Sequence, residues 1–290
     1  MHLRIWKGNN MDILQRIRDL YPTLTKKQRG IADYLLENPE DVCYVTLAQL
    51  SHQTSSSELT LLRFCKKAGC SSFLELKNEF REYTQHMIRL LSAPAYFPPE
   101  TASSEGSDKE ALLTDICRRE AAAVTDFSAS FSPESIVAAA GEIKKSRRIF
   151  IFAHDISKIL GEFLEARLRL LYFNASLIDL ADLAETQNRL QHLNEGDLVI
   201  FFSFPKYYYP MGSIAKKAAD TGVPILTITD SISSPAAEYS THLLLCQTAT
   251  KMFYNSLTLP MTALNLLASC LVIDMVPESE RKDFKKTLSS

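Results

Sequence analysis

The sequence lacks an excess of either charge, because 32 Lys and Arg residues face 34 Asp and Glu residues. Whole-chain electrostatics therefore neither indicate nor exclude nucleic acid, and a DNA-binding surface has to be a local basic patch. The sequence also lacks an uninterrupted run of about 18 apolar residues, the length that crosses a membrane. Its most apolar segment, 255–276, is broken by polar residues and favours a buried helix, so no membrane partner is expected.

Zinc-ligand patterns are missing as well. None of the six cysteines forms a CxxC pair, and no histidine completes a zinc spacing, so we expect no metal and no cofactor. The N-terminal stretch MHLRIWKGNN is too short and polar for a signal peptide. These features favour reduced thiols in a cytoplasmic protein.

A single shift in composition divides the 290 residues. Residues 92–110 are rich in Pro, Ser and acidic side chains, which is typical of a linker. We therefore predict a helical domain over 11–91 and a second domain over 111–280. The overall fold class is α/β: an all-α helix-turn-helix domain, then an α/β/α domain with a five-stranded parallel sheet.

Three capping-box patterns predict helix starts in the first half. They begin at Thr25, Thr46 and Ser72, each with Gln or Glu three residues later. Three such patterns in a short, glycine-poor stretch indicate a compact helical domain.

Short apolar runs in the second half alternate with helical patterns over 157–173, 182–192 and 211–221. Near-continuous apolar strands joined by helices indicate a parallel sheet covered on both faces. The predicted strands are 148–153, 176–179, 197–203, 224–229 and 242–246.

Residues 46–69 predict a helix-turn-helix: a first helix, a polar turn at 54–56, and a second helix with Ser57 as N-cap and Gly69 as its stop. The apolar residues Leu61, Phe64, Cys65 and Ala68 fall on one side of the second helix. The candidate DNA-binding residues are Ser57, Glu58, Thr60, Arg63, Lys66 and Lys67. The three cations would neutralise phosphates, and Glu58 would accept from cytosine N4. The alternative is a helical bundle whose basic face is merely solvated.

The stretch from Leu24 to Tyr83 resembles the N-terminal domain of RpiR-type transcriptional regulators. The matching segments are LTKKQRGIADYLLENPEDV, TLAQLS and SSELTLLRFCKKAGCSSFLELK. The resemblance implies an operator in double-stranded DNA as partner. One departure lies in the turn, where Ser55 and Ser56 stand in place of the usual Gly and apolar residue.

The order of strands and helices after residue 130 resembles the sugar isomerase (SIS) domain attached to these regulators. That resemblance implies a phosphosugar held by two loops at the carboxyl ends of the strands. In this chain Ala153 and Asp155 replace glycines of the first loop, while Pro205, Lys206 and Tyr208 replace Ser, Gly and Thr of the second. The candidate ligand-binding residues are Ser157, Ser203, Lys206, Tyr208 and Ser231.

Three interpretations of this altered site remain open. It binds a different ligand, using Lys206 as a point charge and the tyrosines for stacking or hydrogen bonding. It binds a phosphosugar through Lys206, Ser157 and Ser203. Or it is empty, and the domain is a dimerisation scaffold. Ser157 is otherwise a plain N-cap, and His154 a satisfied loop histidine.

No paired Glu and His mark an isomerase site at the strand ends, so we expect no catalytic activity. The sequence thus predicts a DNA-binding regulator, a homodimer or homotetramer, modulated by a small carbohydrate-type ligand. The alternative is a sugar-phosphate-binding or isomerase protein whose N-terminal helices only mediate assembly.

Overall fold

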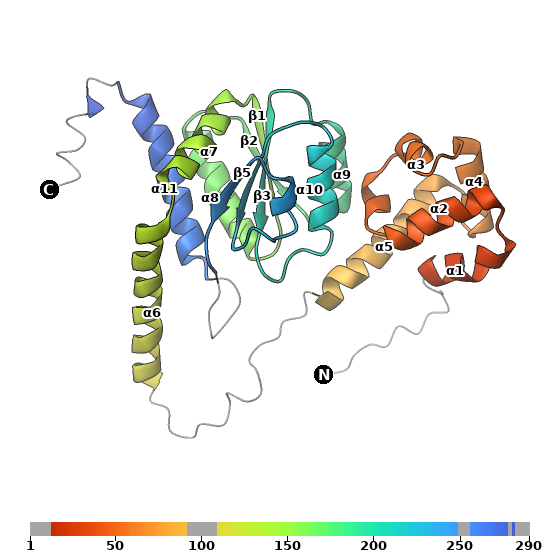
Figure 1. Ribbon diagram of the computed structural model, residues 1–290, viewed down its shortest axis with the longest axis horizontal. Coiled ribbons are helices and arrows are strands. Elements are labelled where there is room, and N and C mark those ends of the chain that lie inside the picture. Colours follow the sequence, from red (N-terminus) through yellow and green to blue (C-terminus); the bar gives the residue numbers. More distant parts are fainter. Residues whose placement is uncertain (1–12, 92–108, 249–255, 278–279, 282–290) are drawn as a thin grey trace. The chain divides into compact units, whose positions relative to one another are not determined.

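A computed structural model describes residues 13–91, 109–248, 256–277 and 280–281. The chain forms two compact units, Met1–Leu91 and Ser92–Ser290 (Figure 1). Of the expected linker, 92–108 lies outside the described residues, whereas Lys109 and Glu110 already belong to a helix.

The N-terminal unit is entirely helical in its described part. A small core holds it together, centred on Leu35, Leu50, Phe64 and Phe80, all fully buried. The buried Lys77 donates from Nζ to the carbonyl of Val45 at 2.8 Å, which satisfies the charge and ties the last helix to a short turn. Its elements are α1 (Ile13–Leu20), η1 (Tyr21–Thr23), α2 (Lys26–Glu37), η2 (Asp41–Tyr44), α3 (Leu47–Gln53), α4 (Glu58–Lys67) and α5 (Phe73–Leu91).

Two of the three predicted capping boxes are confirmed. Thr25 and Thr46 each accept a backbone N–H with the side chain, while Gln28 and Gln49 return the bond to the cap backbone. The third is only half right. Ser72 accepts from the Glu75 amide at 3.1 Å, but the Glu75 carboxylate reaches one residue further back, to the Ser71 amide at 2.6 Å.

The C-terminal unit carries a five-stranded parallel sheet, as predicted, and the structure gives its strand order as β2-β1-β3-β4-β5. The observed strand ends agree with the predicted ones to within one residue. Helices α7, α8 and α11 cover one face and α9 and α10 the other (Figure 1). The elements are α6 (Lys109–Ser130), α7 (Pro133–Lys145), β1 (Arg148–Ala153), α8 (Ser157–Leu170), β2 (Ala175–Asp179), α9 (Leu183–Gln191), β3 (Asp197–Ser203), α10 (Met211–Ala219), β4 (Ile225–Thr229), η4 (Ala237–Tyr239), β5 (His242–Leu245) and α11 (Thr258–Met275).

Helix α8 packs unusually close to the sheet. A Cβ at Gly161 would lie 2.6 Å from Cδ1 of Leu177 on β2, so any other residue there would force the Leu177 side chain to move. Helix α11 is the only described helix long and apolar enough to cross a membrane, yet its buried side chains Leu259, Leu264 and Leu267 belong to the sheet core. It is therefore the core helix that the sequence predicted.

An ion pair fastens β1 to β3 where both strands begin. Arg148 donates from Nε to Oδ1 of Asp197 at 2.8 Å and from NH2 to Oδ2 at 2.5 Å, and the carboxylate of Asp197 is completely buried. It also accepts from the amide of Asn194 at 2.8 Å. Burial alone would raise the pKa of Asp197, but the hydrogen bonds and charge of Arg148 outweigh it and lower this pKa.

Replacing Asp197 by Ala should lower the free energy of unfolding by about 3 kcal/mol, because Arg148 loses its buried partner. Urea denaturation measures this. The contribution is present above the ordinary carboxyl pKa of about 3.9 and disappears as the pH falls through the lowered pKa of the folded state. Asp115→Ala, which breaks an exposed pair with Arg119, should stay within about 0.5 kcal/mol. If Asp197→Ala and Asp115→Ala lose the same unfolding free energy, the buried ion pair is not the stabilising contact that fastens β1 to β3.

Candidate DNA-binding surface and ligand crevice

The turn between α3 and α4 keeps the geometry that a glycine would favour. Ser55 has a φ of +48°, in the left-handed region where a non-glycine residue is strained. Ser56 is buried at the place of the expected apolar residue, and its hydroxyl donates to the carbonyl of Thr54 at 3.2 Å. The substitutions therefore leave the turn closed, with the serine hydroxyl satisfied locally.

Helix α4 separates its faces as predicted. Leu61, Phe64, Cys65 and Ala68 are all buried. Ser57 is the N-cap: its Oγ accepts from the Thr60 amide at 3.3 Å and lies 2.9 Å from the Thr60 hydroxyl. The two hydroxyls therefore bond each other, and Thr60 is only half exposed.

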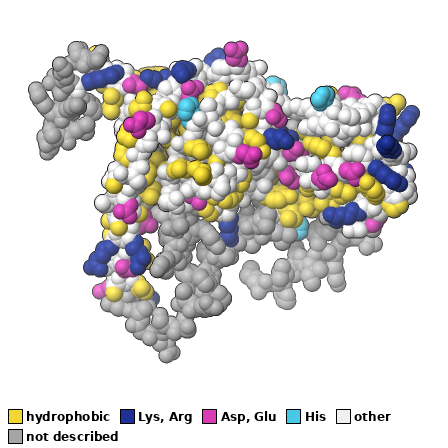
Figure 2. Space-filling model, viewed as in Figure 1, with side chains coloured by type: hydrophobic (Ala, Val, Ile, Leu, Met, Phe, Trp, Pro, Cys, Tyr) yellow, Lys and Arg dark blue, Asp and Glu magenta, His cyan; other side chains and the backbone are white. Residues whose placement is uncertain are grey.

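The charged candidates on α4 differ in what they contact. Glu58, Arg63 and Lys66 are exposed, and the structure gives none of them an ion pair among the described residues. Lys67 donates from Nζ to the carbonyl of Thr23 at 2.6 Å, so it holds the end of η1 against α4. Figure 2 shows Lys and Arg side chains gathered at the end of the N-terminal unit where α4 lies.

One side chain on this face was not among the residues predicted from sequence. Leu59, in the first turn of α4, keeps 58% of its surface exposed. Its spacing of four and seven residues from Arg63 and Lys66 was the available signal, because such residues share a face of a helix.

The five ligand candidates lie at or just beyond the carboxyl ends of β1, β3 and β4, at one edge of the sheet. Tyr208 contacts residues of two other loops at this edge. It is buried, its hydroxyl donates to the carbonyl of Leu180 at 2.6 Å, and its ring lies 4.5 Å from the ring of His154. One side chain from the loop after β3 thus joins the loops after β1 and β2 and fills the space between them.

Two buried polar atoms of residues at this edge have no hydrogen-bond partner among the described residues. They are Oγ of Ser203, a residue that is 1% exposed, and Nδ1 of His154. The expectation that His154 is a satisfied loop histidine is therefore wrong. Burial lowers the pKa of His154 despite the opposing charges of Asp155 and Asp179, so the ring is neutral at pH 7.

The remaining ligand-binding candidates are placed less favourably for contact with a ligand at this edge. Ser157 was expected to cap α8, but Ile156 occupies the N-cap position and Ser157 lies inside the first turn. The reason is a series of tight turns that begins at His154, whose carbonyl accepts from the Ser157 amide at 3.1 Å. The Ser231 hydroxyl bonds locally, 2.8 Å from that of Ser233, and Lys206 is exposed.

Three carboxylates lie at this edge of the sheet. Asp155 is exposed at a φ of +51°, a left-handed conformation that glycine adopts more readily than other residues. Asp179 pairs with Lys158 at 2.8 Å. Burial raises the pKa of Asp179, but the stronger combined effect of Lys158 and of the Ala181 amide leaves this pKa below its ordinary value. Asp230 accepts from the Tyr207 hydroxyl at 2.9 Å, and burial together with this bond raises the pKa of Tyr207 to about 12. The edge therefore carries the carboxylates of Asp155 and Asp230 together with the exposed cation Lys206, while Asp179 is paired with Lys158.

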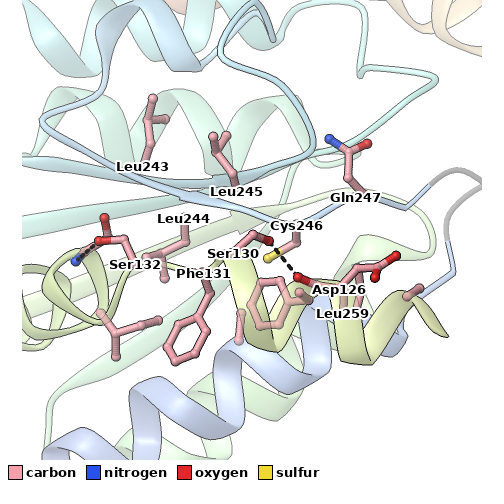
Figure 3. A pocket seen from close by; sticks show the side chains of 15 residues that line it. Asp126, Ser130, Phe131, Ser132, Leu243, Leu244, Leu245, Cys246, Gln247 and Leu259 are labelled. Carbon is pink, nitrogen blue, oxygen red and sulfur yellow. Dashed lines mark hydrogen bonds between the residues drawn. The ribbon is translucent and has the colours of Figure 1, made fainter. Parts of the chain in front are cut away.

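A separate cavity of about 630 Å³ lies beside the edge strand β5 (Figure 3). Its walls are mostly apolar and come from α6, α7, β5 and α11, with Phe127, Phe131 and Leu259 among them. Asp126, Ser130 and Gln247 add polar groups. Within the described ranges, no three His, Cys, Asp or Glu residues group into a metal site.

Family models match both units. Residues 11–87 match the helix-turn-helix domain of the rpiR family, and residues 142–270 match the SIS domain. This chain is an RpiR-type protein. The RpiR-type chain is 26% identical to an uncharacterized HTH-type transcriptional regulator of Haemophilus influenzae, covering 80% of this chain and 79% of the relative. It is 25% identical to the regulator HexR of Pseudomonas aeruginosa, covering 79% and 77%.

Solved structures show the same folds. The sugar isomerase domain of an RpiR transcription factor from Sphaerobacter thermophilus matches 56% of this chain and 90% of its own, with a TM-score of 0.54 and 23% identity. The NanR protein of Vibrio vulnificus, solved with ManNAc-6P, matches 96% of each chain with a TM-score of 0.50 and 20% identity. At these identities the likeness establishes the fold alone.

The hydroxyl of Tyr208 should stabilise the C-terminal unit. Tyr208→Phe removes the bond to the buried loop carbonyl, so we expect about 1 kcal/mol less unfolding free energy. Urea denaturation measures it. The matched control is Tyr172→Phe, because Tyr172 is 98% exposed and should be neutral. If Tyr208→Phe unfolds at the same urea midpoint as the wild type, the Tyr208 hydroxyl does not stabilise the contact between the loops.

Proposed function

We propose that this RpiR-type chain is a sequence-specific DNA-binding transcriptional regulator whose activity responds to a small carbohydrate-type ligand at the SIS domain. The observation that carries the proposal is α4, an N-capped helix that buries one face and exposes Glu58, Arg63 and Lys66 on the other. The first turn of such a helix enters the major groove, and cations along it neutralise phosphates. Relatives named as transcriptional regulators support this function over the alternative, a module that only mediates assembly.

The protein acts in the cytoplasm as a dimer or tetramer without a catalytic step. Oligomers of this kind place two recognition helices on neighbouring half-sites, about one turn of DNA apart. Exposed apolar side chains on α6 and α11, such as Leu112, Leu113 and Met275, support contact with a second copy. At the carboxyl edge of the sheet no Glu and His pair forms a general acid and base among the described residues, which supports a binding role.

DNA binding is tested by removing two exposed cations of α4. Arg63→Ala with Lys66→Ala should weaken binding to all sequences and reduce the slope of log affinity against log salt by about 0.9 for each phosphate that is no longer neutralised. Fluorescence anisotropy at several salt concentrations measures both. Lys66 is chosen over Lys67 because Lys67 already bonds the carbonyl of Thr23.

The matched control removes two exposed cations of the C-terminal unit, with Arg147→Ala and Lys216→Ala. This variant should keep the wild-type affinity and slope. If both double variants behave alike, or if neither differs from the wild type, α4 is not the DNA-binding helix.

The ligand that the crevice favours carries no phosphate. Pro205 has no amide hydrogen to donate, and Asp155 places an exposed carboxylate in the first loop. The unpartnered atoms of Ser203 and His154 instead match the hydroxyl groups of a neutral carbohydrate. Ligand-dependent regulation then follows from a difference in affinity for two arrangements of the protein.

Thermal unfolding with matched pairs of sugars tests this choice, for example N-acetylmannosamine and its 6-phosphate, or glucose and its 6-phosphate. A ligand at 100 times its Kd adds about 2.7 kcal/mol. We expect the unphosphorylated member of a pair to raise Tm more, and Ser203→Ala to abolish the shift. A larger shift from the phosphorylated member would overturn the choice, and no shift with any pair would favour an assembly domain.

A further inference from the structure

Leu59 occupies the centre of the exposed face of α4. Successive residues turn by roughly 100° around a helix, so the buried residues Leu61, Phe64 and Ala68 define one side. The opposite side is centred on Leu59, Arg63 and Lys66, whereas Glu58 and Thr60 fall on its flanks. A leucine with 58% of its surface exposed therefore stands between the charges of the face that would meet DNA.

The fold gains nothing from a large apolar side chain at this point. Leu59 is absent from the buried core, and α4 is already started by its Ser57 cap. Alanine has a slightly higher helix propensity and would expose less apolar surface to water. Exposed leucines such as Leu74 occur elsewhere on the surface, but Leu59 differs from them in lying between the cations of the face that would meet DNA.

The side chains around Leu59 indicate which chemical group of the DNA it would contact. The hydroxyls of Ser57 and Thr60 bond each other, so the first turn offers Leu59 and Glu58 as its outward groups. In the major groove the apolar mark on a base is the C5-methyl group of thymine, which accepts contact from apolar side chains. Arg63 lies one turn further along the same face of α4, in position to contact the DNA backbone or a guanine base.

We propose that Leu59 packs on the C5-methyl group of a thymine in each half-site and so fixes the base at that position. The inference rests on the proposed DNA-binding function. The proposal gives a DNA contact to Leu59, which is not among the polar residues predicted from the sequence. It also identifies the contacted base as thymine, from the methyl group that an apolar side chain would touch.

The test uses the full-length protein and a duplex enriched from a random DNA pool by the wild type. Each thymine of one half-site is replaced in turn by deoxyuridine, which lacks only the methyl group and keeps its hydrogen-bonding pattern. Affinities are measured by anisotropy for the wild type, Leu59→Ala and Leu74→Ala. Leu74 is the matched control, because it is 62% exposed but lies on α5.

At one thymine, deoxyuridine should lower wild-type affinity about fourfold, the value of one buried methyl group. The same replacement should have no effect on Leu59→Ala and its full effect on Leu74→Ala. An unchanged melting temperature shows that Leu59→Ala is folded. A second variant, Leu59→Gln, keeps the length of the side chain and should also lose sensitivity to the methyl group.

Two results overturn the inference. Either no deoxyuridine lowers wild-type affinity, or the reduction is the same in Leu59→Ala as in the wild type. In both cases DNA binding itself stands. Failure of the wild type to enrich any sequence is a different outcome, because it removes the proposed function and the inference together.

Discussion

Burial of the parallel sheet on both faces is the constraint from which the C-terminal unit follows. Every residue of β3 and β4 is buried, so the sheet needs cover on both faces. The chain returns in the same direction through α8, α9 and α10 after β1, β2 and β3, and through the short helix η4 after β4. All carboxyl ends then meet at one edge, while Arg148 and Asp197 fasten the opposite ends of β1 and β3. The candidate site is therefore positioned by the strands, and β3 also supplies Ser203, its last residue.

At that edge, residues from several loops contact one another. Tyr208 spans from the loop after β3 to Leu180 and packs against His154, so three loops that would each face a ligand are joined by one ring. Asp155 adds a strained, positive φ and an exposed carboxylate to the same edge.

Local patterns predicted most of the fold from sequence. Capping boxes at Thr25 and Thr46 depend on contacts three residues apart, and apolar runs at strand spacing depend only on burial, so both could be read directly. The box at Ser72 failed in part because the long Glu75 side chain can reach past the Ser72 amide to the amide of Ser71. The cap at Ser157 failed because a tight turn after His154 starts the helix early.

The candidate site was less predictable, since its contacts join residues far apart in the chain. Nothing in the sequence around Tyr208 indicates that its hydroxyl bonds Leu180, 28 residues away. Helical spacing did place Leu59 beside Arg63, but an exposed leucine is noticed only when its surface is known. Polar residues were favoured in the prediction because their chemistry is visible in the sequence.

The closure of the crevice by Tyr208 has a kinetic consequence. Ser203 is 1% exposed, so a ligand that bonds its hydroxyl has to wait until the covering loops part. Association that requires such a rearrangement is slower than diffusion. At high ligand concentration the observed rate then levels off at the rate of loop opening. If the proposed ligand binds at Ser203, the response time is then set by loop opening rather than by the supply of ligand.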